Sequence, residues 1–476
     1  MKTNKKLLIG LLLFSLATRL PFLFGNNIPF SFDHGRDAIA VLDLIKTYSI
    51  KFIGPWTSIQ GLFFGPGWYY LLTPLYWLLN GNPLAGPLTM QIISLITIGL
   101  AYKYFGVYEA IIFATAPIFT IISVSAANPF PMVLIGLLIL ICLKKPKRQA
   151  LNLGLLVSLG FHFSSALAIF YLLIIPLILL IRKIKLNLKK LIIGLIIPFI
   201  PQVLFEIKHN WLEVRSLVSY FANGESQQIT PGKIEIVTKS IVSELSLAIL
   251  PDTAWLYYLG LGLLIIGMVY LIAKRKINIF WPEIILFILI PVVGFWFLHY
   301  NVWYVYGLLP VIVIAVGKIL RSAPKIISYS YLGLLIIGAI KIPVQQTGIA
   351  FLPVKLQALN YIYDQARDKP FSSYQYLPNI YDYGYQYLYF WQAFNGRPLP
   401  VEFSYKPGEV SYVQEKPDLL KLFPVNNRPA EIIFLIIEKP ENIYHYPLQS
   451  WLNNIKYSEI ISKKEFGSEL EVWQIK

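Results

Sequence analysis

The chain has little charge and almost no cysteine. Only 14% of its 476 residues are charged whereas 56% are hydrophobic, and uncharged runs such as Ile111 to Leu143 recur. This composition excludes an ordinary soluble protein and indicates a polytopic membrane protein. The single cysteine, Cys142, excludes an intrachain disulfide and leaves the redox compartment open.

Motifs for metals and nucleotides are also missing. The five histidines are scattered, and no two of them stand at i and i+4 on one predicted helix, so the spacing predicts no metal site. The glycines of Phe64-Gly65-Pro66-Gly67 form a turn and not a phosphate-cradling loop. No cofactor is therefore expected to be required, although a divalent cation held weakly by Asp33 and Asp37 stays open.

Positive charge is abundant, with a formal net charge of +16. It falls in short clusters between apolar runs, as the positive-inside rule expects of cytoplasmic loops, so we predict membrane topology and no nucleic-acid partner. The clusters are Lys2 to Lys6, Lys144 to Arg148, Arg182 to Lys190, Lys274 to Lys276, and Lys318 to Lys325.

An even number of crossings must separate any two cytoplasmic clusters, and this parity sets the helix count. The segment 62–79 carries Pro66, Pro74 and many aromatic residues, so we predict that it lies in the outer interface and does not cross. About eleven transmembrane helices remain, with the first retained and the amino terminus cytoplasmic. They are predicted at 7–24, 84–102, 107–124, 130–143, the two arms of a thin hairpin at 150–181, 191–205, 254–273, 279–298, 303–319 and 326–342.

The tail is predicted to be a separate domain on the outer side of the plasma membrane. We place the membrane domain at 1–345, with a first outer loop at 25–61, and a small extracytoplasmic α/β domain at 346–476. A strand-like run at Glu431 to Ile437 and a helix-like segment at Lys355 to Arg367 support this prediction. The tyrosines of Tyr374 to Tyr389 suit a sugar-stacking surface, a membrane-facing surface or a structural aromatic cluster.

One charged motif stands out just beyond the first hydrophobic segment. Phe32-Asp33-His34-Gly35-Arg36-Asp37-Ala38 places two carboxylates, a histidine and an arginine in an apolar chain. An aspartate within hydrogen-bond reach of an acceptor hydroxyl is a suitable general base, whereas the plain alternative is an exposed salt bridge or a helix N-cap at Asp33. Arg36 is placed to orient a carboxylate or to touch a phosphate.

The layout resembles the GT-C superfamily of integral membrane glycosyltransferases, and within it the protein O-mannosyltransferase and aminoarabinose transferase-like enzymes. The resemblance covers about residues 1–345. Its local matches are the Asp33 motif, Ser125-Ala126-Ala127-Asn128-Pro129, Gly160-Phe161-His162-Phe163-Ser164, and Phe205-Glu206-Ile207-Lys208-His209-Asn210. In the family a second acid often follows the first, whereas here His34 follows Asp33, which leaves the roles of His34 and Asp37 open.

The resemblance implies an inverting transferase that moves a sugar from a polyprenyl-phosphate carrier to a lipid, protein or glycan hydroxyl on the outer side. Asp33 is the predicted base and Asp37 the second catalytic carboxylate. Because the leaving phosphate needs cations and donors, we predict substrate contacts from the remaining candidates. These are His34, Arg36, Arg19, His162, Lys208, His209, His299, Tyr300 and Tyr304.

Two other functions stay open. A flippase for lipid-linked oligosaccharides, or another transporter, would also be polytopic, basic and aromatic, but transporters tend to place charge near the midplane and to show paired repeats. A polymerase or ligase of lipid-linked glycans is the second alternative. The early acidic motif favours the transferase.

Overall fold

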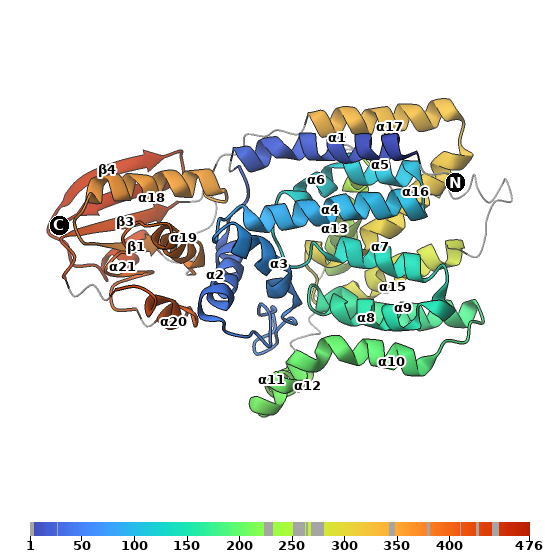
Figure 1. The fold of residues 1–476 in the computed structure, drawn as a ribbon, viewed down its shortest axis with the longest axis horizontal. Coiled ribbons are helices and arrows are strands. Elements are labelled where there is room, and N and C mark those ends of the chain that lie inside the picture. The colour runs from blue at the N-terminus through green and yellow to red at the C-terminus, as the bar shows by residue number, and fades with distance from the viewer. Residues whose placement is uncertain are drawn as a thin grey trace. The chain divides into compact units, whose positions relative to one another are not determined.

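The computed structural model describes residues 4–25, 27–222, 232–250, 262, 265–267, 280–341, 348–377, 381–409, 411–424, 428–439 and 447–476. The chain forms two compact units, which we describe separately (Figure 1). Unit 1 comprises Met1–Arg19, Lys51–Leu71 and Thr89–Ile342, and unit 2 comprises Leu20–Ile50, Leu72–Leu88 and Pro343–Lys476. The first unit is helical, and the second contains the sheet.

The helices of the apolar region agree closely with the predicted segments. They are α1 (Lys5–Phe24), α4 (Ala85–Tyr104), α5 (Val107–Thr115), α6 (Pro117–Ser123), α7 (Met132–Cys142), α8 (Ala150–Gly160), α9 (Ser165–Ile181), α10 (Leu188–Ile196), α11 (Ile200–Lys208), α15 (Phe280–Phe297), α16 (Leu309–Ser322) and α17 (Lys325–Ile340). The predicted helix at 254–273 lies outside the described residues.

Four helical stretches among the described residues are long and apolar enough to cross a membrane: Lys5–Phe24, Ala85–Tyr104, Leu188–Lys208 and Val302–Ser322. Shorter apolar helices, including the hairpin arms α8 and α9, accompany them. The chain is thus an integral membrane protein by its helices, while the number of eleven crossings stays a prediction. Helix α3 (Gly67–Leu78) has 12 residues, about 18 Å, which is too short to cross about 30 Å of hydrocarbon.

Prolines explain where the predicted helices break. The segment 107–124 is divided at Ala116, whose extended backbone precedes Pro117. The segment 191–205 passes through a 3₁₀ turn at Ile197–Phe199 before α11 begins. Proline removes a backbone donor and disfavours the helical conformation of the residue before it, so the first segment becomes two helices. In the second segment Ile197 and Ile200 keep helical backbone angles before their prolines, so Leu188–Lys208 stays one helical stretch that contains the 3₁₀ turn.

Close backbone contact joins α8 to α10. A Cβ atom built on Gly154 would lie 2.2 Å from the carbonyl oxygen of Leu191, and one built on Gly194 would lie 2.3 Å from that of Leu151. The two glycines therefore face one another and permit a separation that larger residues would prevent, as small residues do between membrane helices. Figure 1 shows α10 running beside α8.

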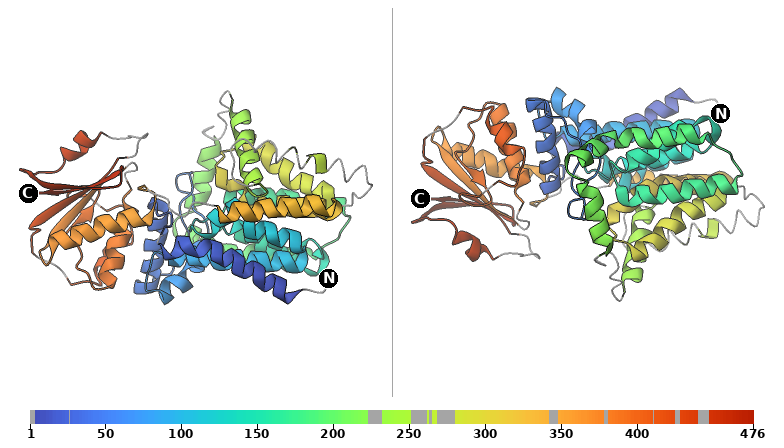
Figure 2. Two further views of the ribbon diagram at one scale, coloured as in Figure 1. Left: turned by 90° about the horizontal axis from the view of Figure 1, so that it is seen from above. Right: turned by 90° about the horizontal axis from the view of Figure 1, so that it is seen from below.

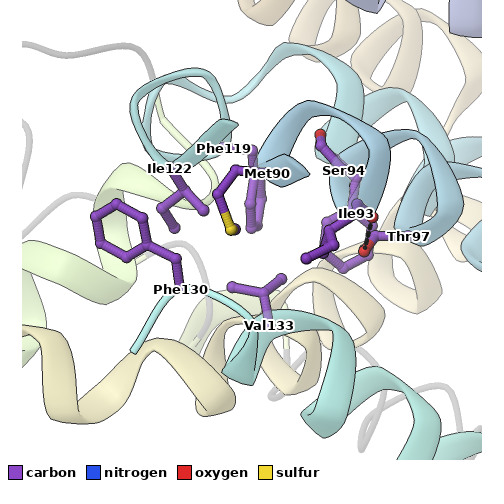
Figure 3. Close-up of a pocket in the computed structure, with 9 residues that line it drawn as sticks. Met90, Ile93, Ser94, Thr97, Phe119, Ile122, Phe130 and Val133 are labelled. Carbon is purple, nitrogen blue, oxygen red and sulfur yellow. Dashed lines mark hydrogen bonds between the residues drawn. The ribbon is translucent and has the colours of Figure 1, made fainter. Parts of the chain in front are cut away.

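Few voids remain among the described helices around α4. One cavity of about 20 Å³ is lined by side chains of α4, α5, α6 and α7, with Phe130 at the approach to α7 (Figure 3). Its lining is mainly apolar, and the hydroxyl of Thr97 is already bonded to the Ile93 carbonyl at 2.8 Å. This volume is about that of one water molecule, so we regard the cavity as a packing defect rather than a ligand site.

Unit 2 contains a five-stranded mixed sheet, which confirms the prediction of an α/β tail. Its order is β2-β1-β3-β5-β4, with β1 parallel to β2 and β3, and β5 antiparallel to β3 and β4. The bounds are β1 (Phe371–Tyr376), β2 (Phe403–Ser404), β3 (Ile432–Glu438), β4 (Ile460–Phe466) and β5 (Leu470–Ile475). The apolar run predicted at 431–437 is the central strand β3.

Helices cover both faces of this sheet (Figure 2). Trp451 of α21 (Leu448–Leu452) packs in a buried cluster with Tyr376 and Leu435 on one face. On the other face lie α18 (Leu352–Ala366) and α19 (Tyr383–Phe394), where Tyr389 of α19 contacts Phe371. The central strand β3 is therefore buried on both sides, which explains its nearly continuous apolar sequence.

The compact units differ from the sequence boundary predicted between 345 and 346. Helix α2 (Phe32–Thr47), in the predicted first outer loop, packs against α19 and α20 (Lys416–Leu420) and belongs to the unit of the tail. Residues 72–88 belong to it as well. The sequence boundary followed hydrophobicity, whereas this division follows tertiary contacts that composition does not reveal.

The α8–α10 contact generates a prediction. We expect Gly154→Ala to lower the free energy of unfolding by about 1–3 kcal/mol, since the added methyl group overpacks the crossing. In α17, a Cβ on Gly333 meets nothing within 4 Å, so Gly333→Ala should be neutral or stabilise by up to about 1 kcal/mol. Thermal unfolding of both variants in detergent measures the difference, and equal midpoints would contradict the proposed contact.

Candidate functional site

Helix α2 begins inside the charged motif. Ser31 is its N-cap, and the ring Nδ1 of His34 accepts a hydrogen bond from the Ser31 backbone N–H at 3.1 Å, forming a capping box. The alternative that Asp33 caps a helix beginning near His34 is therefore wrong, because Asp33 already lies in the first turn. A carboxylate there is favoured by the positive end of the helix dipole.

Arg36 lies between the two carboxylates of the motif. Its Nη1 is 2.6 Å from Oδ1 of Asp33, and its Nη2 and Nε are each 2.8 Å from Oδ1 of Asp37. The Asp33 side chain is 48% exposed, whereas those of Arg36 and Asp37 are 8% and 3% exposed. The motif thus divides into one accessible carboxylate and a buried ion pair that holds it in place.

This arrangement bears on the metal question. The guanidinium of Arg36 contacts both Asp33 and Asp37, so a cation shared by these carboxylates would have to displace it. Among the described residues, no group of three or more His, Cys, Asp or Glu side chains converges as a metal site would require. The described residues therefore give no ligand set from which to derive metal chemistry.

Burial keeps His34 neutral. It lowers the pKa of the imidazole from 6.5 to about 4, and the effects of Asp33 and Arg36 on that pKa are smaller and opposite in sign. Because Nδ1 accepts the Ser31 N–H, the ring proton of the neutral form lies on Nε2. The observed contacts give His34 a part in forming the helix.

Helix α2 is fastened to α19 by an unusually close approach. A Cβ built on Gly35 would lie 2.4 Å from the backbone nitrogen of Gly384 and 2.5 Å from its Cα. Next to this contact Phe32 packs near Tyr381, with ring centroids 6.0 Å apart, and α2 and α19 lie side by side in Figure 1. The tail domain therefore positions the acidic motif.

The tyrosine-dense segment is mainly structural. Tyr383, Tyr385, Tyr387 and Tyr389 of α19 are all buried. The hydroxyl groups of Tyr385, Tyr387 and Tyr389 bond within unit 2, as Tyr389 does with Ser373 at 2.7 Å. Of the three interpretations left open by the sequence, the structural aromatic cluster accounts for these four residues. Their hydrogen bonds satisfy phenols in the domain core.

A buried polar network at the start of α19 was missed by sequence reasoning. Asp382 is fully buried, accepts a 2.7 Å bond from Gln386 and a bond from the Tyr412 hydroxyl, and its pKa is raised by burial. Burial lowers the pKa of nearby Lys416 to about 8. The only sequence signal was an aspartate before an aromatic helix, which does not reveal that Tyr412 and Lys416 converge on it.

The remaining sequence-predicted residues lie in unit 1. Arg19 is fully buried, and its guanidinium bonds to Ser123 Oγ at 3.1 Å and to the Ala114 carbonyl at 2.8 Å. These bonds hold its guanidinium among α1, α5 and α6. Nη2 of Arg19 and the hydroxyls of Ser15 and Thr120 are buried without a hydrogen-bond partner.

His162 joins three segments of unit 1. Its Nδ1 accepts the N–H of Gly67 at 2.9 Å, and its Nε2 lies 3.0 Å from the carbonyl of Pro198. Both ring nitrogens are thus used in structural bonds, and the prediction of substrate binding gains no support from them. The matched motifs around His162 and Asn128 do meet, because Asn128 Nδ2 donates to the Phe163 carbonyl at 2.9 Å.

The predicted pair at the end of α11 is exposed. Lys208 and His209 are both solvent-accessible, and His209 stacks on Phe205 with ring centroids 4.0 Å apart. Glu206, which we expected to pair with Lys208, instead accepts the backbone N–H groups of Glu213 at 2.9 Å and Val214 at 3.1 Å. It therefore caps α12 (Leu212–Ala222) and serves the fold.

The predicted residues after α15 do come together. The ring of His299 lies 6.2 Å from that of Tyr304, and Tyr300 and Tyr304 both pack on Phe295. The Tyr304 hydroxyl is 3.3 Å from Ser58, and that of Tyr300 is 3.1 Å from Ser240. We call His299, Tyr300 and Tyr304 the aromatic cluster.

Glu244, which sequence reasoning missed, bonds to Tyr306 nearby.

Comparisons with known proteins identify structures that share the fold of this chain. The chain matches no family model and no curated protein sequence. Two crystal structures of ArnT from Cupriavidus metallidurans, one bound to undecaprenyl phosphate and one in the apo state, match at a TM-score of 0.60 and 10% identity. The matches cover 97% and 98% of both chains. Over nearly its whole length, this chain shares the fold of ArnT.

The likeness to ArnT agrees, for the fold, with the resemblance seen in the sequence. The match extends beyond the predicted range of 1–345 and includes the tail. At 10% identity it carries no residue of ArnT over to this chain. The roles of individual residues therefore depend on the geometry described above.

The His34 contact predicts a pH dependence of stability. The unfolded imidazole takes up a proton near pH 6.5, whereas the folded one resists until about pH 4. This residue's contribution to stability is therefore complete above pH 6.5 and is lost as pH falls towards 4, by at most about 3 kcal/mol. Glutamine at position 34 keeps the capping box without titrating. Unfolding midpoints of His34→Gln should fall less steeply than wild type over this range, and equal slopes would contradict the assignment.

The contact of α2 with α19 predicts a second effect. Gly35→Ala should displace α2, destabilise unit 2 by about 1–3 kcal/mol and reduce whatever activity depends on Asp33. Gly384→Ala is the matched control, because its Cβ would meet its nearest neighbour, the Ser31 carbonyl, at an ordinary 3.7 Å. Thermal unfolding and activity are measured on both variants. Equal effects of the two substitutions would show that the close contact at Gly35 does not determine the position of α2.

Proposed function

We propose that this protein transfers a sugar from a polyprenyl-phosphate carrier to an acceptor hydroxyl on the outer side of the membrane, with Asp33 as the general base. The fold shared with ArnT, one structure of which is bound to undecaprenyl phosphate, supports the class of enzyme and of lipid partner. The orientation, with a cytoplasmic amino terminus and an extracytoplasmic tail, belongs to the same proposal and follows from the positive-inside pattern.

The observation that carries the catalytic assignment is the division of the acidic motif. Asp33 is the accessible carboxylate, at 48% exposure, and Arg36 fixes it through a contact of 2.6 Å. Asp37 is buried on the other side of the guanidinium. A base must reach the hydroxyl that it deprotonates, and of the two carboxylates Asp33 has the access.

The reaction places separate demands on the chain. The acceptor oxygen forms a bond to the anomeric carbon while its proton passes to Asp33, and the bond from that carbon to the carrier phosphate oxygen breaks. Arg36 and Asp37 act as positioning residues in this scheme, since they hold Asp33 rather than reach the substrate.

The sugar and the acceptor are open within this proposal. The described residues of α2 include one accessible carboxylate, which could accept the proton of any hydroxyl acceptor. Selection among lipid, protein and glycan acceptors must come from other surfaces. The tail is the natural candidate, because it carries α19, against which α2 is packed.

Asp33→Asn tests the proposal in membranes incubated with radiolabelled polyprenyl-phosphate sugars, with the label followed into lipid, protein and glycan fractions. Loss of a general base should lower transfer about 10²–10⁴-fold. Asp368→Asn is the matched control, since Asp368 is an exposed aspartate elsewhere in unit 2, and it should transfer at the wild-type rate.

Two outcomes would count against the proposal. Equal transfer by wild type and Asp33→Asn would remove Asp33 from the chemistry. No transfer from any donor, together with movement of a labelled lipid between leaflets in vesicles containing the protein, would favour the flippase.

A further inference from the structure

Basic residues gather around a second cavity of unit 1, far along the chain from the residues of the acidic motif. The cavity measures about 210 Å³ and is lined by Tyr104, Phe105, Leu140, Leu143, Lys144, Arg182, Glu283, Lys318 and Arg321. It lies where α4, α7 and α9 end and α15 begins. Three of the basic clusters predicted to be cytoplasmic, at 144–148, 182–190 and 318–325, contribute these cations.

Two carboxylates form bidentate pairs with the two arginines. Arg321 binds Glu109 through two bonds of 2.6 and 2.7 Å, and Arg182 binds Glu283 through Nε and Nη2. Both glutamates are buried. These bidentate pairs are rigid and neutral overall, and they form part of the wall of the cavity.

Lys144 and Lys318 add two positive charges to this neutral frame. The ammonium of Lys144 bonds to the Tyr104 carbonyl and lies 3.9 Å from the Phe105 ring centre. The carboxyl ends of α4, α7, α9 and α16 contribute about half a negative charge each, and the amino ends of α5 and α15 contribute about half a positive charge each. Together the helix ends offset about one of the two lysine charges. The positive excess therefore remains.

We propose that this cavity binds a phosphate group, most directly the headgroup of an anionic lipid of the inner leaflet. Basic pockets between membrane helices on the cytoplasmic side are suited to phospholipid headgroups. A volume of 210 Å³ equals that of about seven water molecules, which leaves room for a phosphate and part of its ester. The site is distinct in its residues from the proposed transfer chemistry.

The test uses the full-length protein purified in neutral detergent, with thermal unfolding followed as lipid or phosphate is added. The probes are phosphatidylglycerol, cardiolipin, zwitterionic phosphatidylcholine and inorganic phosphate. Wild type should be stabilised by the anionic lipids and not by phosphatidylcholine. In Lys144→Gln with Lys318→Gln, the half-saturating lipid concentration should rise about thirtyfold, as expected for two lysines near a charged headgroup.

Lys147→Gln with Lys325→Gln is the matched control, because it removes two exposed charges from the same clusters outside the described cavity lining. It should bind as wild type does. Lys144→Arg with Lys318→Arg keeps both charges and should retain binding. If it does, the loss of binding in the glutamine variant results from the lost charge and not from a failure to fold.

The probes distinguish the source of the phosphate. Stabilisation by the anionic lipids alone supports a headgroup site, and stabilisation by millimolar inorganic phosphate that is lost in the glutamine variant supports a site for free phosphate. Equal lipid response in the glutamine variant and its control, or no response in wild type, would overturn the proposal.

Discussion

The close approach of α2 to α19 is the constraint on which the candidate site depends. Gly35 lets a helix of the predicted first outer loop lie directly against the backbone of α19 at Gly384, more than 300 residues later in the chain. Large side chains could bury more apolar area there, but they would hold the helices apart. Because Arg36 and Asp37 follow Gly35 at once, the contact also fixes where the buried ion pair and the accessible Asp33 lie.

Much of the fold could be predicted because lipid imposes simple rules. Every backbone polar group in hydrocarbon must be bonded within the chain, so long apolar segments become helices, and the segments predicted at 84–102 and 326–342 agree with α4 and α17 within two residues at each end. The strand at 432–438 was found for a similar reason, since burial on both faces leaves a continuous apolar run. Local composition is sufficient to predict an element when all residues of that element lie in the same apolar environment.

The candidate site was harder to predict because its contacts join distant segments. The Asp33 motif is visible as a local anomaly of charge, yet nothing in it shows that Ser31 rather than Asp33 caps the helix, or that Asp37 is buried. His162 was predicted to contact substrate because it stands alone in an uncharged run. Its partners are backbone groups at Gly67 and Pro198, and a sequence pattern does not show which backbone groups a side chain will meet.

The same physical rule separates structural charges from candidate functional ones in this molecule. An ion removed from water costs several kcal/mol unless it is fully bonded, and the buried carboxylates of Glu109, Glu283 and Asp37 each have an arginine partner. Asp33 shares Arg36 with Asp37, and about half of its side-chain surface is exposed to solvent. Its carboxylate is therefore hydrated, and a substrate hydroxyl can reach it by displacing water. Lys144 and Lys318 belong to a cavity lining in which four basic side chains accompany the two buried carboxylates Glu109 and Glu283. Access at Asp33 favours proton transfer, whereas the net positive charge of this lining favours binding of an anion, so we assign the two sites different roles.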